Sequence, residues 1–283
     1  MLVGRVAGET RFFDRTVAPC EAAAMAARLD PDLLATPLAE ALLRVLDRKT
    51  HWAWHYLTEP GLSRGQLLAH FRHEYLVYVR DFPVLLGTSL GRTPPILEVR
   101  KSLAENLYEE QTGGLSGSGP HPELFLILMD ALGFERSFFA DDDGSLTTAA
   151  RSYRDWIGAT VREAPWQVGA ALLTIFVEGS RNDRGELLGT FKRPKGETAV
   201  LAHPLVRHYG VAADRMALTK AHAAVEGSHR TDAWHMVLTH TPHSSEIAII
   251  LVNTMEEALT RWLAYRDSVA DAMSLERPPI APE

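Results

Sequence analysis

The chain has 283 residues, 46% of them apolar and 23% charged, which is the ordinary composition of a globular protein with a substantial core. Its formal net charge of -7 argues against a nucleic-acid partner, because such a partner usually requires a basic face. A single cysteine, Cys20, and no apolar run longer than residues 247–252 predict a cytoplasmic protein without an intrachain disulfide, a signal peptide or a membrane span.

Helix signals dominate the first third of the chain. Apolar side chains recur at helical spacing over residues 37–57, and a second helix is predicted to run from Ser63, a favourable N-cap, to Val79. Pro83 should kink or end this second helix, because proline removes a helical hydrogen bond. A third helix is predicted between Pro95 and the glycines that begin at Gly113.

The middle of the chain continues the helical pattern with two loops. Residues 114–120 form a Gly/Ser-rich loop by composition, and a helix then runs over residues 121–132. Residues 140–147 read as an acidic loop, and two further helices are predicted over residues 147–163 and 165–179.

The last third is predicted to contain a long polar loop over residues 181–203 and helices over residues 211–240 and 244–272. No alternating strand pattern, internal repeat or composition break is present. The sequence therefore predicts an all-α fold, with one domain of seven to eight helices over residues 1–274 and a disordered tail over residues 275–283.

A histidine and carboxylate triple carries the strongest chemical signal. His222, Glu226 and His229 stand at positions i, i+4 and i+7, so on a helix they lie within about 60° of one another. Two imidazoles and a carboxylate on one face can chelate a divalent metal, and the absence of thiolate ligands favours iron, manganese or zinc. A solvated polar face is the alternative. Asp232 and His235 continue the pattern with poorer alignment and are interpreted as outer partners or surface residues.

Two further segments supply candidate ligands. Glu110 closes one predicted helix and His121 opens the next, although acids at a helix end are usually solvated and a histidine before proline usually belongs to a turn. Glu178 follows an apolar helical run, so it must be paired, protonated, metal-bound or at the helix edge. We expect residues 110–121 to be mobile without metal, because the Gly/Ser loop buries little apolar surface.

In combination these segments resemble the haem-oxygenase-like di-iron oxidases and oxygenases, which are related in fold to pyrroloquinoline quinone synthase, TenA and CADD-like proteins. Members show an Asn-x2-Asp/Glu-Glu segment, a downstream His-x2-Leu, a lone Glu on the following core helix and a late His-x3-Asp/Glu-x2-His. The resemblance spans roughly residues 40–260. This chain departs from the pattern in the lengthened Gly/Ser loop before His121 and in having Glu226 where aspartate is more usual.

The resemblance implies a haem-oxygenase-like helical bundle that holds two Fe(II) ions and uses O2 as a co-substrate. The implied metal ligands are Glu110, His121, Glu178, His222, Glu226 and His229. The reaction would be oxidation of a small molecule, either N-oxygenation of an amine or oxidative C–C cleavage of an amino-acid-derived or carboxylate substrate. The early aromatic helix of the family is matched by Phe71, Tyr75 and Tyr78, and we expect these three and Trp54 to contact the substrate.

Three alternatives stay open. A cofactor-independent oxidase on the same fold would bind an anionic substrate through basic residues such as Arg181, Lys192, Arg193 and Lys195. A TenA-like hydrolase would use an active-site cysteine, and Cys20 lies in a region without helix signals. A non-catalytic helical binding protein is the third alternative. Iron content separates the first prediction from the others, and a homodimer is common among similar proteins.

Overall fold

The computed structural model describes residues 29–141 and 144–278, and the side chains of Glu226 and Ser228 lie outside that description. Cys20 and the tail beyond residue 278 lie outside it as well. The first residues of the predicted disordered tail are held against the fold, because Arg277 Nη2 pairs with Asp267 at 2.8 Å.

The described residues form helices and connecting segments without a strand, which confirms the all-α prediction. The first half contains α1 (Pro31–Leu34), α2 (Pro37–Asp47), α3 (Trp54–Thr58), α4 (Arg64–Glu74), the π-helix η1 (Tyr75–Val79), α5 (Phe82–Arg92), α6 (Leu97–Thr112), α7 (His121–Ala131) and the 3-10 helix η2 (Arg136–Phe139). The second half contains α8 (Thr148–Glu163), α9 (Trp166–Ala171), the π-helix η3 (Leu172–Val177), α10 (Asp183–Leu187), α11 (Gly196–Ala202), α12 (Pro204–Tyr209), the 3-10 helix η4 (Ala213–Arg215), α13 (Ala217–Thr239) and α14 (Glu246–Ala272).

Several helices begin where the sequence supplies a cap. The side chain of Ser63 accepts a hydrogen bond from the Gln66 backbone N–H, and the Gln66 side chain accepts one from the Ser63 N–H, so both orphan donors at the start of α4 are satisfied. Ser245 caps α14 through the Ala248 N–H at 3.2 Å. These local signals explain why the helix starts were predictable.

Two predictions of element bounds were wrong. The helix predicted over residues 37–57 ends at Asp47 and resumes as α3, and His51 Nδ1 accepts from the Ala53 N–H at 3.2 Å in place of a helical carbonyl partner. The loop predicted over residues 181–203 contains α10 and α11, because α11 packs against α13 and buries Val200 completely. Helix–helix packing thus ordered a segment whose composition is polar.

Two π-helical segments interrupt the α-helical path. Tyr75–Val79 follows α4 directly, and Leu172–Val177 follows α9 directly. The helix begun at α4 ends before Pro83, which stands in the first turn of α5, as its ring geometry favours. Such π segments often mark functional sites, since the widened turn redirects the side chains around it.

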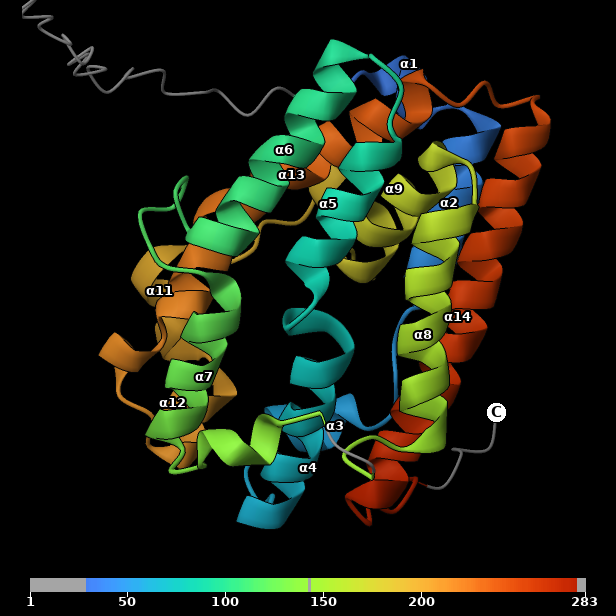
Figure 1. Ribbon diagram of the computed structural model, residues 1–283. Helices are drawn as coiled ribbons and strands as arrows, with labels where there is room; N and C mark the ends of the chain where they lie inside the picture. The colour runs from blue at the N-terminus through green and yellow to red at the C-terminus, as the bar shows by residue number, and fades with distance from the viewer. Residues whose placement is uncertain (1–28, 142–143, 279–283) are drawn as a thin grey trace, which may run out of the picture.

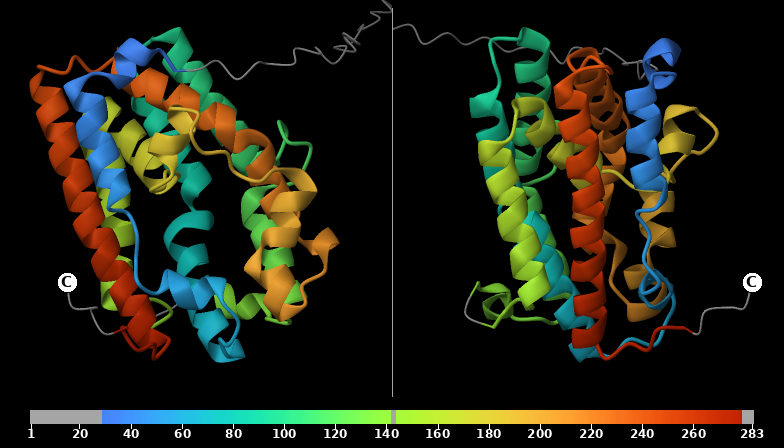
Figure 2. Two further views of the ribbon diagram at one scale, coloured as in Figure 1. Left: turned by 180° about the vertical axis from the view of Figure 1, so that it is seen from behind. Right: turned by 90° about the vertical axis from the view of Figure 1, so that its right-hand side faces the viewer.

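The helices form two sides with a central column between them (Figures 1 and 2). On one side α14 packs against α2, α8 and α9, and on the other α13 packs against α6, α7 and α11. The path through α4, η1 and α5 runs between the two sides. The largest fully buried side chains are Trp234, Tyr153, Tyr265 and Phe176, which places the aromatic core on α8, η3, α13 and α14.

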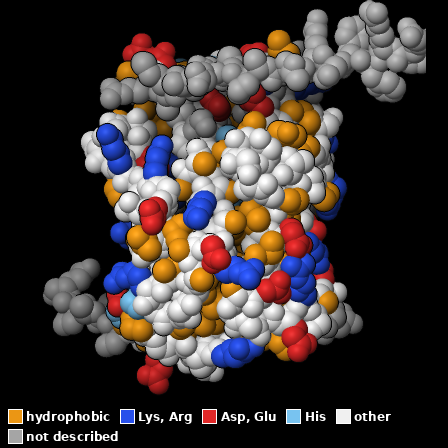
Figure 3. All heavy atoms as spheres, turned by 90° about the vertical axis from the view of Figure 1, so that its left-hand side faces the viewer, with side chains coloured by type: hydrophobic (Ala, Val, Ile, Leu, Met, Phe, Trp, Pro, Cys, Tyr) orange, Lys and Arg blue, Asp and Glu red, His pale blue; other side chains and the backbone are white. Residues whose placement is uncertain are grey.

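The surface of one side carries mixed charge. Over the coloured part of the face in Figure 3, Lys, Arg, Asp and Glu side chains lie interspersed among apolar ones. Mixed signs of this kind keep the local potential low. None of the described helices combines the length and the apolar character that crossing a membrane requires.

Candidate metal centre

Three of the predicted ligands meet at one point between helices. Glu110 lies near the end of α6, His121 opens α7, and His222 lies in the second turn of α13. One ligand atom from each lies within 4.8 Å of the other two. The rings of His121 and His222 have centroids 4.9 Å apart in a T-shaped arrangement. The fold therefore brings together side chains that are separated by up to 112 residues.

These side chains form part of the wall of a cavity of about 490 Å³, within the range of small-molecule sites. Glu178 and His229 line the same cavity, so five of the six predicted ligands face one space. The side chain of the sixth, Glu226, lies outside the described residues. Asp232 and His235 are not among the lining residues of this cavity, and His235 is exposed, in agreement with their interpretation as outer or surface residues.

His121 lies between two carboxylates. Its Nε2 is 3.2 Å from Glu109 Oε1, and its Nδ1 is 3.0 Å from Glu110 Oε1. Burial lowers the pKa of His121, but the two carboxylates outweigh burial and raise the pKa above its ordinary value. Nδ1 makes no hydrogen bond, although it is buried and close to Glu110, because the carboxylate does not lie in line with the ring N–H direction. The two carboxylates therefore favour a positive charge beside them, either on the His121 ring or on a bound cation.

Glu109 is the residue that holds His121 in place, and its role was missed by the sequence reasoning. Its side chain is 0% exposed, and it accepts hydrogen bonds from the Leu115 N–H at 2.8 Å, the Ser116 N–H at 3.0 Å and the Ser116 hydroxyl. Burial would raise the pKa of Glu109, but these hydrogen bonds and the one from His121 lower it overall. A metal-ligating histidine usually donates its second ring N–H to such a group.

The Gly/Ser loop is hydrogen-bonded to the same carboxylate. Its backbone folds back over the end of α6, where Gly113 adopts a left-handed conformation with φ of 66°. A Cβ at Gly113 would lie 2.5 Å from the backbone of Gly119, so only glycine permits this close approach. Glu109 binds the loop through three hydrogen bonds, which the expectation of a mobile loop did not consider, and the mobility of residues 110–121 without metal stays a prediction.

Glu178 is positioned at the end of η3 by two neighbours. Asn106, one turn before Glu109 on α6, donates a hydrogen bond from Nδ2 to Glu178 Oε1 at 3.0 Å. The ammonium group of Lys49 donates to the carbonyl oxygens of Phe176, Val177 at 3.2 Å and Gly179 at 2.7 Å, which flank Glu178 on both sides. Lys49 therefore caps the carbonyl end of the helix that carries the predicted ligand.

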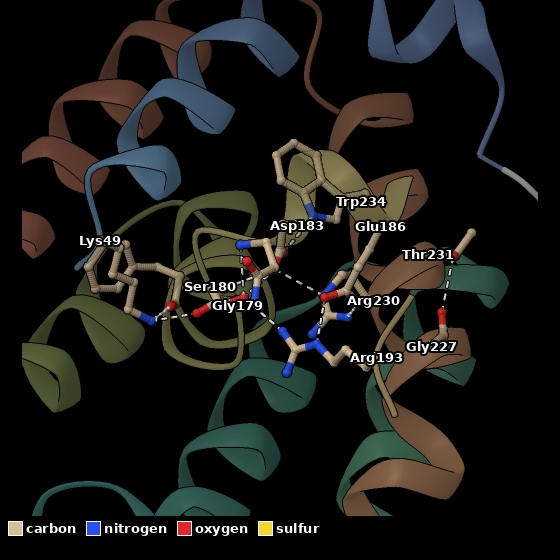
Figure 4. Close-up of polar contacts among 12 residues, drawn as sticks. Lys49, Gly179, Ser180, Asp183, Glu186, Arg193, Gly227, Arg230, Thr231 and Trp234 are labelled. Atoms are coloured by element: carbon tan, nitrogen blue, oxygen red, sulfur yellow. Dashed lines mark hydrogen bonds and ion pairs between the residues drawn. The ribbon is translucent and has the colours of Figure 1, made fainter. Parts of the chain in front are cut away.

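The loop after Glu178 is tied to α13 by a buried charge network (Figure 4). Asp183 is 0% exposed and accepts from the Ser180 N–H at 2.8 Å, and Arg230 Nε lies 3.2 Å from it. Arg230 also pairs with Glu186, and Trp234 Nε1 donates to Asp183 at 3.4 Å. Because Arg230 directly follows His229, this network fixes the α13 segment relative to Glu178.

Of the four aromatic residues predicted to contact a substrate, two line the cavity and two do not. Trp54 and Tyr78 line the cavity. Phe71 and Tyr75 are not among its lining residues, because their rings pack against Phe125, at centroid distances of 6.1 Å and 5.4 Å. Phe71, Tyr75 and Tyr78 have the i, i+4 and i+7 spacing that would share one face of a regular α-helix, but the π-helix η1 begins at Tyr75 and changes that register before Tyr78.

The four basic residues considered for an anionic substrate lie in two different hollows. Arg181 lines this cavity, whereas Lys192, Arg193 and Lys195 line a neighbouring hollow that shares Asn182, His222 and Arg230 with it. Arg193 is paired with Glu186 and donates to the Ser180 hydroxyl at 2.7 Å.

The donor set fits an iron ion. Imidazole and carboxylate are the ligand types that non-haem iron uses, and the described donors are two carboxylates and three imidazoles facing one space. His121 Nδ1 is buried without a hydrogen bond and lies 3.0 Å from Glu110 Oε1, so it supplies a ligand atom beside a carboxylate ligand. Burial lowers the pKa of His229, which favours the neutral imidazole that a metal requires.

Comparisons with known proteins identify the fold and the family of the chain. The crystal structure of a TenA homolog from Pseudomonas syringae pv. tomato str. DC3000 superposes with a TM-score of 0.62 at 14% sequence identity, over 84% of this chain and 93% of that chain. At this identity the likeness concerns the fold, and it confirms the predicted haem-oxygenase-like bundle. No curated protein matches the chain at a significant level. A family model described as an iron-containing redox enzyme matches residues 69–262, more than half of the sequence, and the chain therefore belongs to this family of iron-containing redox enzymes.

Proposed function

We propose that the protein is a non-haem oxidase or oxygenase that holds two ferrous ions and uses O2 to oxidise a small organic molecule. The observation that carries the proposal is the approach of Glu110, His121 and His222 within 4.8 Å at the wall of a cavity of about 490 Å³. Three helices converge to make this group, and a solvated polar face would not bury His121 to 1% exposure.

The residues that would hold the two ions are Glu110, His121, Glu178, His222, Glu226 and His229. Three carboxylates neutralise three of the four positive charges of two Fe(II) ions, so the site keeps an affinity for further anionic or neutral ligands. Bound ferrous iron would supply the electrons for the reaction with O2, while the protein contributes geometry and a partly closed space.

The surrounding residues fix the ligand atoms in advance of metal binding. The proton on His121 Nε2 is held by Glu109, which leaves Nδ1 as the ligand atom facing Glu110. Asn106 holds Oε1 of Glu178 at 3.0 Å and so orients this carboxylate at the cavity wall. Preorganisation of this kind reduces the entropy that metal binding must overcome.

The experiment that tests the proposal compares His229→Ala with His235→Ala. Both histidines lie on α13, but His229 faces the cavity and His235 is exposed. After anaerobic reconstitution with Fe(II), we expect about two irons per wild-type chain and O2 consumption with a transient visible absorption band. His229→Ala should bind iron at least about tenfold more weakly and lose the O2 reaction, whereas His235→Ala should match the wild type.

Two outcomes would contradict the proposal. Wild-type iron content and O2 consumption in His229→Ala would show that His229 does not ligate. Absence of iron in the reconstituted wild type would instead favour a cofactor-independent oxidase or a non-catalytic binding protein on the same fold. A circular dichroism spectrum of each variant confirms that the helical fold is retained.

A further inference from the structure

The wall of the cavity opposite the metal donors has a different chemistry. It is built by residues of α3, α4, η1 and α14, whereas the donors come from α6, α7, α13 and the end of η3. Figures 1 and 2 show α14 and the pair α6 and α7 on opposite sides of the central column. The residues of this second wall that carry the argument are Trp54, Glu74, Tyr78, Trp262 and Arg266.

Arg266 is the buried cation of this wall, with 7% of its surface exposed. Its guanidinium carbon lies 4.7 Å from the ring centroid of Trp54, 5.4 Å from that of Trp262 and 4.8 Å from that of Tyr265. Aromatic faces stabilise a desolvated cation and hold the planar group in a fixed orientation. The side chain is therefore a rigid feature of the cavity wall.

Most of the hydrogen-bonding capacity of Arg266 is unused. Nη1 donates to Glu74 Oε1, which also accepts from the Tyr265 hydroxyl at 2.8 Å. Nε is buried without a hydrogen-bond partner, and Nη2 has none among residues 29–141 and 144–278. A buried donor without an acceptor is costly, and its presence on a cavity wall indicates an acceptor that the cavity accommodates.

The geometry of the guanidinium selects the kind of acceptor. Nε and Nη2 form one edge of its planar fork, which matches the two oxygens of a carboxylate. Among the other cations that line the cavity, Lys49 donates to three carbonyl oxygens and Arg230 pairs with Asp183 and Glu186. Arg181 also lines the cavity but is exposed, so Arg266 is the buried cation with donors to spare. Trp54, Tyr78 and Trp262 surround the fork with apolar surface suited to a hydrophobic body.

We infer that Arg266 binds the carboxylate of the substrate, and that the substrate is a small carboxylic acid with an apolar body that extends towards Glu110, His121 and His222. This inference rests on the proposed function, because it assigns the substrate class of that same cavity. The two ends of the substrate are then distinguished electrostatically, since the carboxylate end meets the arginine and the reacting end meets the metal ligands.

Binding of octanoate and of octanamide, its neutral counterpart, tests the inference. Full-length protein is prepared both chelator-treated and iron-loaded under nitrogen, and affinities are measured by isothermal titration calorimetry. We expect octanoate to bind the wild type at least about tenfold more tightly than octanamide, about 1.4 kcal/mol. In Arg266→Lys the preference should fall severalfold, because the ammonium lacks the planar fork.

Removal of Arg266 alone leaves Glu74 buried without its partner, so the double variant Arg266→Met with Glu74→Gln serves as a second test. It should retain the fold and lose the preference for octanoate. Arg261→Gln is the matched control, because Arg261 lies on the same helix, is paired with Glu257 and does not line the cavity. This control should bind octanoate as the wild type does.

The outcomes separate the inference from the proposed function. Unchanged octanoate affinity in both Arg266 variants, or equal wild-type affinities for octanoate and octanamide, would overturn the inference even if iron binds normally. If no preparation binds iron but octanoate binding still depends on Arg266, the carboxylate site stands and the proposed iron chemistry fails. Iron content of every preparation is therefore measured alongside the affinities.

Discussion

The two ends of the cavity differ in their hydrogen-bonding groups: one has more acceptors than donors and the other has more donors than acceptors. At the donor end, defined by Glu110, His121 and His222, acceptor atoms crowd together and a buried ring nitrogen makes no hydrogen bond. At the arginine end, defined by Arg266 and Glu74, donors exceed acceptors and Nε is unpartnered. The comparison indicates a cavity that takes a cation at one end and an anion at the other.

The two ends are also held by different means. The donor end depends on hydrogen bonds from residues near in the chain, since Glu109 binds the loop six and seven residues ahead and His121 twelve residues ahead. The arginine end depends on a pair separated by 192 residues and on four aromatic rings. Variants that disturb one end should therefore leave the other intact.

Glu109→Gln should give the largest difference between the effect of a substitution on the donor end and its effect on the arginine end. The neutral amide weakens the hold on His121 Nε2, and changes to such outer partners typically cost about 10- to 100-fold in metal affinity. We expect iron affinity to fall within this range while octanoate binding at the arginine end changes little. The measurement is competitive iron binding against a colorimetric chelator, with octanoate titrations on the same samples.

Glu105→Gln provides the control for this change. Glu105 lies one turn earlier on α6, is 45% exposed in its side chain and pairs with Lys101 at the surface. It should bind iron as the wild type does. Wild-type iron affinity in Glu109→Gln would mean that Glu109 orders the loop without positioning His121.

Sequence patterns predicted the fold and the donor end better than the arginine end, and the reason is physical. Helical periodicity and caps are local, so the helices were predictable, and the spacing of seven residues was enough to place His222 and His229 on one helix face. Glu109 carried a weaker signal, because it stands beside Glu110 in the same segment and its donors, Leu115 and Ser116, lie six and seven residues further along the chain. Arg266 gave a weak local signal, since Trp54, Glu74 and Tyr78 lie on α3, α4 and η1 and only the packing of the bundle brings them to it.

Lys49→Met tests whether the lysine that caps the end of η3 stabilises the fold and the position of Glu178 at the donor end. The substitution leaves three carbonyl oxygens near Glu178 without their donor, which should lower the free energy of unfolding by about 1 to 2 kcal/mol. Iron affinity should fall less than in Glu109→Gln, because Asn106 still holds Glu178. Chemical denaturation and the same competitive iron assay give the two values.

Lys101→Met, which removes an exposed lysine of α6, is the control for Lys49→Met. It should change neither stability nor iron affinity measurably. Equal stability of Lys49→Met and the wild type would show that water replaces the lysine at the carbonyl oxygens and that the cap has no mechanical role.

The smallest expected effect is a dependence of stability on pH at the arginine end. Burial raises the pKa of Glu74, but Arg266, His70 and the Tyr265 hydroxyl outweigh burial and hold the pKa below its ordinary value of 4.5. Because the folded protein binds the Glu74 proton less readily than the unfolded chain, the stabilisation is fully present above pH 4.5 and is lost as the pH falls through the folded value. The wild type should therefore lose more stability than the double variant Arg266→Met with Glu74→Gln between about pH 6 and the acid limit of folding. Urea unfolding of both proteins across this range measures the difference, in which the titration of all other carboxyl groups cancels. Parallel curves would show that Glu74 and Arg266 are not an ion pair in solution, and Arg266 would then have its whole fork free for an anion.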